Sequence, residues 1–168
     1  MLHWKVTDFA SLTVFELYDI LKLRVDVFIT EQHCPYSDLD NKDTDSNTLH
    51  VLGYHDDKLV AYSRILPPGL GYPHEVHDQI PVNACDIAIG RVVTNHTYRG
   101  QGFGHQLMAF SVKTAKEKWP YKSIFISAQA HLASFYGQYG FMTATHPYEE
   151  DGIPMLGLIW SPSMEKVV

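Results

Sequence analysis

The sequence predicts a mixed α/β fold, an α+β mixed sheet with helices packed on it, and three observations support this class. Strand-like and helix-like segments alternate along the 168 residues, the composition is 45% hydrophobic, and no repeat or low-complexity segment interrupts the chain. A chain of this length can bury one substantial core but is short for two domains. We therefore expect a single domain over residues 1–168, with the element order β-α-β-β-β-α-β-α-β-β.

Each expected element follows from a local pattern. Ser11 or Thr13 can cap a helix whose apolar residues recur at helical spacing, and Asp56-Asp57-Lys58 can close a tight hairpin. Pro120 ends the second long helix. The expected elements are a strand at 2–7, a helix at 11–29, hairpin strands within 50–66, a strand at 85–94, a helix at 102–119, a strand at 122–129, a short helix at 131–139, and strands at 141–146 and 155–160.

Charge and composition exclude several classes of partner. The formal net charge is −6 and the sequence pI is about 5.9, so no general positive field attracts nucleic acid or an anionic membrane. No run of 18 uncharged apolar residues and no targeting pattern occurs. We expect a soluble, cytoplasmic protein in which Cys34 and Cys85 are reduced thiols. The closest histidines, His74 and His77, lack a metal-ligand spacing, so no metal is expected.

Residues 91–105, RVVTNHTYRGQGFGH, join a strand to the second long helix and place Gly100, Gly102 and Gly104 directly after Arg99. A Walker loop would need GxxxxGK[ST], and these glycines do not keep the GxGxxG spacing of a dinucleotide site. The amides at the start of a helix and the positive end of its dipole can instead hold one anion. The segment predicts a diphosphate loop, with a glycine-rich helix entry that binds nothing as the alternative.

The arrangement Arg-x-x-Gly-x-Gly between a strand and a long helix resembles the pyrophosphate loop of the GCN5-related N-acetyltransferase (GNAT) superfamily. Downstream, SIFISAQAHLASFYGQYGF supplies Ala133, Tyr136 and Gly140-Phe141 in the order that follows this loop in the superfamily. The resemblance extends over nearly the whole chain to the ElaA-like branch, through LKLRVDVFITEQHCPYSDLD, IGRVVT and YEEDGIPM. It implies the acyl-CoA N-acyltransferase fold and N-acetyl transfer from acetyl-CoA.

The resemblance also implies roles for individual residues. The main chain of Val92, Val93 and Thr94 would contact the pantetheine arm of acetyl-CoA. Tyr136 would protonate the departing thiolate, with packing of its ring beneath the CoA arm as the alternative. The other residues expected to hold the cosubstrate are Arg99, Gly100, Gln101, Gly102, Phe103, Gly104 and His105 of the loop, and Gln129, in place of a superfamily asparagine.

The acceptor amine must lose a proton before it attacks, and the fourth strand carries no carboxylate where some relatives place a base. Glu31 at the end of the first helix is the expected base, through a relayed water, with helix capping or solvation as the alternative. Arg91 on a central strand needs a partner. We expect an ion pair with Glu31 or with an aspartate of residues 38–45, and a substrate carboxylate is the alternative. The acidic residues 38–45, together with Glu149, Glu150 and Asp151, either favour a cationic amine or are solvated.

The expected function is therefore acetyl transfer to a primary amine of a small molecule or peptide, by direct attack in a ternary complex. Direct attack needs no covalent intermediate, so Cys34 is expected to be inert. The alternatives are a CoA-binding regulatory module and a protein-interaction domain, both with little or no turnover. A homodimer is compatible with these expectations, because dimers are the commonest soluble oligomers.

Overall fold

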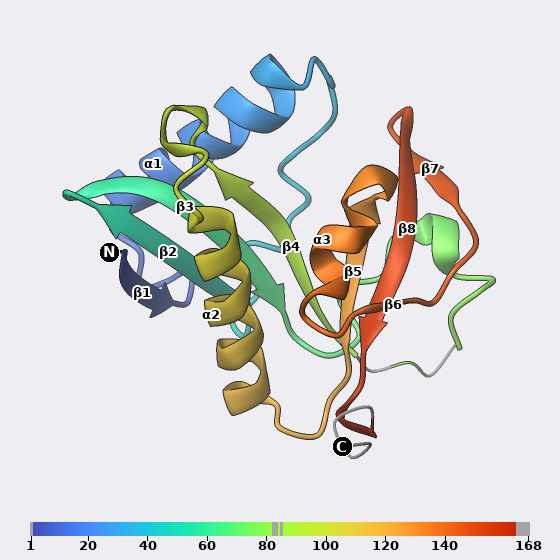
Figure 1. Ribbon diagram of the computed structural model, residues 1–168. Coiled ribbons are helices and arrows are strands. Elements are labelled where there is room, and N and C mark those ends of the chain that lie inside the picture. The colour runs from blue at the N-terminus through green and yellow to red at the C-terminus, as the bar shows by residue number, and fades with distance from the viewer. Residues whose placement is uncertain (1, 82–83, 85, 164–168) are drawn as a thin grey trace. The chain divides into compact units, whose positions relative to one another are not determined.

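The computed structural model describes residues 2–81, 84 and 86–163 (Figure 1). The elements are β1 (His3–Thr7), α1 (Val14–Arg24), the π-helical turn η1 (Val25–Glu31), β2 (Leu49–His55), β3 (Lys58–Leu66), η2 (His74–Val76), β4 (Ile87–Thr94), η3 (His96–Tyr98), α2 (Phe103–Lys118), β5 (Ile124–Gln129), η4 (Ala130–Leu132), α3 (Ala133–Gly137), β6 (Met142–Thr143), β7 (Tyr148–Glu150) and β8 (Ile153–Trp160). The mixed α/β class is confirmed. The three-residue strand β7 was not indicated by the sequence pattern, and Cys85 lies outside the described residues.

The chain divides into two compact units, which are described separately. Unit 1 comprises residues 1–65 and 91–111, and unit 2 comprises residues 66–90 and 112–168, so far as these are described. Strands β3 and β4 and helix α2 contribute residues to both units. The expectation of a single domain stays a prediction.

Unit 1 contains β1, β2, β3 and the second half of β4, which are neighbours in that order. Strand β1 pairs antiparallel with β2, and β2 pairs antiparallel with β3. The turn between β2 and β3 consists of Asp56 and Asp57, which both have positive φ, 47° and 61°. Two positive φ values are what a tight two-residue hairpin requires, so the predicted hairpin is confirmed.

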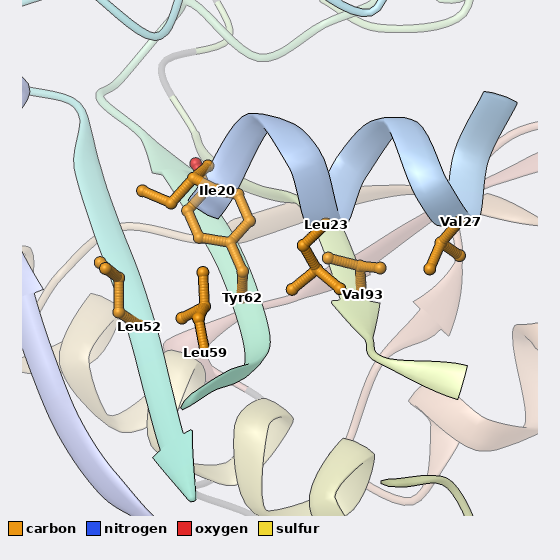
Figure 2. Packing of buried hydrophobic residues seen from close by; sticks show 7 residues of the cluster. All are labelled: Ile20, Leu23, Val27, Leu52, Leu59, Tyr62 and Val93. Atoms are coloured by element: carbon orange, nitrogen blue, oxygen red, sulfur yellow. The ribbon is translucent and has the colours of Figure 1, made fainter. Parts of the chain in front are cut away.

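Helices cover both faces of the unit 1 strands. The α1 helix is capped by Thr13, whose hydroxyl accepts from the Glu16 amide at 3.1 Å, and it buries apolar side chains against β2 and β3. Figure 2 shows these residues: Ile20, Leu23, Val27, Leu52, Leu59, Tyr62 and Val93. On the opposite face, Ser63 bonds Ser111 of α2 at 2.7 Å. This packing fixes the end of β4 and the start of α2.

Unit 2 contains the first half of β4 followed in the sheet by β5, β8 and β6, with β7 also paired to β8. Strand β4 runs parallel to β5 through Ile87 with Ile124 and Ala88 with Phe125, and β5 pairs antiparallel with β8. A core of Leu66, Val76, Ala88 and Phe125 packs on one face of these strands.

Candidate functional site

The glycine-rich segment follows β4 in unit 1 and leads into α2. Before it, the Asn95 amide donates to the Val60 carbonyl at 2.8 Å, and the Asn95 side chain accepts from the Thr97 amide at 3.0 Å. Gly100 and Gly102 have φ values of +78° and +76°, which residues with a Cβ rarely adopt. The glycines are therefore required by the backbone path and do not mark a flexible turn.

Aromatic contacts fix both ends of this segment to the hairpin of unit 1. The ring of His55, at the end of β2, lies 5.9 Å from the Tyr98 ring and 5.4 Å from the Phe103 ring. Phe103, the first residue of α2, is buried. Such contacts give the segment a defined shape before any ligand binds.

The backbone of the segment is open to an approaching anion at two glycines. Apart from the glycine itself and its two neighbours in the chain, no described residue has a heavy atom within 4 Å of the position that a Cβ would take at Gly100 or Gly102, so both peptide groups can be approached closely. The Gln106 amide donates to the Gly102 carbonyl at 3.1 Å, which starts the helix. By helix geometry, the amides of Phe103 and Gly104 have no acceptor inside the helix, and the positive end of the dipole favours an anion there.

Arg99 and Glu31, which were predicted separately, are brought together in unit 1. Arg99 Nη1 donates to Glu31 Oε1, and Nη2 donates to Oε2 at 3.1 Å. The two side chains are 44% and 38% exposed. This bidentate ion pair joins the end of η1 to the glycine-rich segment, so both oxygens of the expected base accept hydrogen bonds from the expected phosphate-binding arginine.

The predicted partner of Arg91 is confirmed as an aspartate. Arg91 Nε donates to Asp38 Oδ1 at 2.8 Å, and Nη2 donates to the Asp38 carbonyl at 2.9 Å and lies 3.5 Å from Asp40 Oδ2. Its guanidinium lies 5.6 Å from the centre of the Tyr36 ring. The backbone of Arg91 has a φ of +52°, an unusual value for a residue within a strand. Glu31, the other expected partner, is bound by Arg99.

Two further arginines complete a buried ionic network that the sequence did not reveal. Arg24 donates to Asp38 Oδ2 and Asp43 Oδ1, both at 2.8 Å, and Arg64 donates to both oxygens of Asp40 at 2.7 Å. Although burial alone would raise the pKa of Asp40, hydrogen bonds and the charge of Arg64 hold it well below the ordinary value. Within the described residues, Arg64 Nε has no hydrogen-bond partner. Most of the aspartates among residues 38–45 are thus ion-paired rather than solvated.

The remaining cosubstrate candidates of unit 1 lie on β4. Val93 is buried in the α1 core, while Val92 and Thr94, its neighbours in the strand, are partly exposed. These residues follow Ala88, the last residue of β4 with a recorded partner on β5.

Tyr136 and Gln129 belong to unit 2. Tyr136 lies in the short helix α3, is 6% exposed, and contacts the rings of Phe135 and Phe141 edge-on. Burial raises the pKa of Tyr136 to about 12, so the phenol keeps its proton at neutral pH. Gln129 is the last residue of β5 and the N-cap of η4.

Glu150, one of the acidic residues expected to favour a cationic amine, is hydrogen-bonded within unit 2. The Ser127 hydroxyl of β5 lies 2.6 Å from the Tyr148 hydroxyl and 2.6 Å from Glu150 Oε2, both of β7. The motif YEEDGIPM was visible in the sequence, but its side-chain contacts depend on a strand too short to be indicated by a pattern.

The described part of the chain holds neither a metal-binding cluster nor a membrane-spanning helix. Residues 2–81, 84 and 86–163 contain no group of three or more His, Cys, Asp or Glu side chains arranged to hold a metal ion. None of the helices described is both long enough and apolar enough to cross a membrane.

Known proteins resemble the chain over nearly its full length. The family model described as Acetyltransferase (GNAT) domain matches residues 17–161. Protein ElaA of Escherichia coli (strain K12) is 41% identical over 158 residues, 94% of this chain and 95% of that protein. The crystal structure of an acyl-CoA N-acyltransferase from Pseudomonas aeruginosa has a TM-score of 0.83 at 40% identity, over 96% of this chain and 100% of that one. The crystal structure of Escherichia coli ElaA has a TM-score of 0.80 at 39% identity, over 95% and 99%.

These similarities agree with the arrangement of the strands and the glycine-rich segment. The open mixed sheet is that of acyl-CoA N-acyltransferases, whose family uses acyl-CoA as the donor of the acyl group. The chain therefore belongs to the GNAT family of acyltransferases and is an ElaA-like member of it.

Proposed function

We propose that the protein is an N-acetyltransferase that moves the acetyl group of acetyl-CoA to a primary amine of a small molecule or peptide. The observation that supports the proposal is the open, positive-φ glycine segment at the start of α2, where helix amides and the helix dipole favour an anion such as a diphosphate. The proposal keeps the cytoplasmic location, the ternary complex and the compatibility with a homodimer that the sequence predicts.

The donor is proposed to bind through main-chain groups and one arginine. Diphosphate binding is assigned to residues 99–105, where Arg99 supplies a positive charge and the glycines allow close approach. Val92, Val93 and Thr94 are proposed to contact the pantetheine arm through their main chain. Gln129 is proposed to assist through its side-chain amide.

Tyr136 is the proposed general acid. Attack of the amine nitrogen on the thioester carbon breaks the C–S bond, and the electron pair of that bond stays on sulfur. The Tyr136 phenol, which is neutral at neutral pH, would give its proton to this thiolate and regain one from solvent. The net reaction converts an ammonium and a thioester into an amide, a thiol and one released proton.

The role of Glu31 as the base stays a prediction. Its carboxylate is held by Arg99 in the ligand-free chain, so it would have to leave that ion pair before it could accept a proton. Binding of a diphosphate to Arg99 would permit this release.

Thiol release tests the proposed function. The protein is incubated with acetyl-CoA and a panel of alkyl diamines, amino acids, aminoglycosides and short peptides, and free CoA is measured with a thiol reagent. We expect release above the amine-free rate with at least one class, together with the acetylated product by mass spectrometry. Binding of acetyl-CoA without turnover on any amine would instead favour the regulatory CoA-binding module.

A further inference from the structure

Ser127, Tyr148 and Glu150 form a hydrogen-bonded chain with a fixed direction. A carboxylate only accepts hydrogen bonds, so the Ser127 hydroxyl donates to Glu150 Oε2 at 2.6 Å. The Ser127 oxygen is then the acceptor for the Tyr148 hydroxyl at 2.6 Å. Tyr148 keeps its proton at neutral pH, because burial raises its pKa to about 12. The hydrogen bonds therefore run from Tyr148 through Ser127 to Glu150, and they orient the Glu150 carboxylate.

This polar chain is built against an apolar core. The Tyr148 ring packs against the cluster of Leu66, Val76, Ala88 and Phe125. A hydroxyl held beside such a cluster costs free energy unless it is hydrogen-bonded, as that of Tyr148 is to Ser127. Apolar side chains would hold the β7 segment there without that cost, so the polar chain points to a chemical role.

Ser127, the middle member of this hydrogen-bonded chain, lies on β5 just beyond the part of the strand that is paired with β4. Phe125 is the last residue of β5 with a recorded partner on β4, and Ser127 lies two residues further along β5. Alternation along a strand places Ser127 on the same side as Phe125 and Gln129. Ser127 and the carboxylate that it holds thus lie beyond the part of β5 that is paired with β4.

We propose that Glu150 is the general base that deprotonates the acceptor amine, and that Ser127 and Tyr148 are positioning residues that hold its carboxylate. This inference rests on the proposed function. In the step, an N–H bond of the substrate ammonium breaks and the proton passes to a Glu150 oxygen. The electron pair of that bond stays on nitrogen, which attacks the thioester carbon, and Glu150 later loses the proton to solvent.

Two other glutamates are less suited to this role. Both oxygens of Glu31 accept hydrogen bonds from Arg99. Glu149, the neighbour of Glu150 on β7, is exposed. Glu149 therefore supplies a matched control that carries the same charge in the same strand.

The charges around Glu150 favour a cationic acceptor. The strands β5 (IFISAQ) and β8 (IPMLGLIW) contain no ionisable side chain. The titratable groups of η2, which packs against β7, are His74 and Glu75, and the charge of Glu75 acts on Tyr148. Within β7 and the following turn, the other groups are Tyr148, Glu149 and Asp151. The surroundings are thus predominantly acidic, and the substrate class that they suit is a positively charged primary amine.

The test is the pH profile of kcat/KM for the amine that gives the highest thiol release with the wild-type protein. Glu150→Gln should lower kcat/KM at pH 7 by about 10²- to 10⁴-fold, the usual contribution of a general base. In this variant the rate should follow the unprotonated amine and rise toward the ordinary amine pKa of about 10.4. Glu149→Gln removes one of the surrounding negative charges at an exposed site, so it should lower kcat/KM by less than about fivefold and keep the wild-type form of the pH profile. The acetyl-CoA Kd of both variants should change by less than about twofold.

Ser127→Ala provides a second variant that keeps the carboxylate and removes its anchor. We expect a loss of about tenfold in kcat/KM at pH 7, with the wild-type form of the pH profile, because Glu150 still titrates. If Glu150→Gln fails to fold, Ser127→Ala carries the test.

Two outcomes would overturn the inference alone. In the first, the wild-type protein is active and Glu150→Gln has the same kcat/KM as the wild type. If Glu150→Gln does not fold, the same result for Ser127→Ala counts instead. In the second, these variants lose acetyl-CoA affinity as well as turnover, which would indicate a structural role. Absence of thiol release by the wild-type protein with every amine would instead overturn the proposed function, and this inference with it.

Discussion

The ion pair between Arg99 and Glu31 predicts that Glu31→Gln tightens the binding of acetyl-CoA. In the ligand-free chain the Arg99 guanidinium donates to both oxygens of Glu31, and Nη2 also lies 3.5 Å from the Thr94 carbonyl. If Arg99 binds the diphosphate, the donor must displace the Glu31 carboxylate. Removal of that carboxylate therefore removes a competitor for the same guanidinium.

The expected size of this effect follows from the exposure of the pair. Both side chains are more than one-third exposed, and exposed ion pairs contribute about 0.2–1 kcal/mol. The bidentate geometry places this pair toward the upper end of that range. Because 1.4 kcal/mol corresponds to about tenfold in Kd, Glu31→Gln should lower the Kd of acetyl-CoA by about two- to fivefold.

Calorimetric titration at low ionic strength measures this change directly. Glu117→Gln is the matched control, because Glu117 is an exposed partner of Lys113 on α2 and its removal changes the net charge equally. The difference between the variants should shrink at high salt, where exposed charges are screened. An unchanged or weaker affinity of Glu31→Gln would refute the competition and would mean that Glu31 orients Arg99 toward the donor.

Four further predictions address the acid, the ionic network and the loop. Tyr136→Phe should lower kcat by about 10²- to 10⁴-fold in steady-state thiol release, with less than about a twofold change in acetyl-CoA Kd, and an unchanged kcat would exclude the general acid. Arg24→Met should lower the free energy of unfolding in urea by about 3–5 kcal/mol, because two buried aspartates lose a partner, and a loss below about 1 kcal/mol would contradict that account. The pKa of Asp40 is depressed in the folded state, so its contribution to stability is complete above the ordinary value of about 3.9 and is lost as the pH falls through the folded-state pKa. The difference in unfolding free energy between Asp40→Asn and the wild type should therefore be constant from pH 5 to 7 and narrow below about pH 3.9, and a pH-independent difference would argue against it. Gly102→Ala should weaken acetyl-CoA binding by about tenfold, since a Cβ at positive φ costs about 1–2 kcal/mol, and unchanged binding would show that the loop does not need this conformation.

Much of the fold was predictable because its signals are local. The hairpin turn at Asp56-Asp57 and the entry to α2 depend on residues that are adjacent in sequence. The three-residue strand β7 is too short for any periodicity, and it forms because β8 supplies hydrogen-bond partners. Its place in the fold could only be learned from the three-dimensional structure.

The candidate site also has one part that was predictable from the sequence and one part that was not. The role proposed for the glycine segment follows from its backbone conformation, and the glycines in the sequence already indicate that conformation. The ionic partners do not follow from sequence, because Arg24 and Asp38 are separated by 14 residues and Arg91 and Asp38 by 53. The sequence indicates that Arg91 needs a partner but leaves Glu31 and an aspartate of residues 38–45 as equal candidates. Only the contacts within unit 1 identify the partner as Asp38.

The central claim is that residues 99–105 bind the diphosphate of the donor, and a comparison of two thioesters by calorimetry tests it most directly. Acetyl-CoA carries the diphosphate and the 3′-phosphoadenosine, and S-acetylpantetheine has the same thioester and arm without either. Charge-assisted hydrogen bonds contribute about 1.5–3 kcal/mol each, so loss of the diphosphate should weaken binding on the order of 100-fold or more. Equal affinity for the two compounds, or no binding of acetyl-CoA, would contradict the claim.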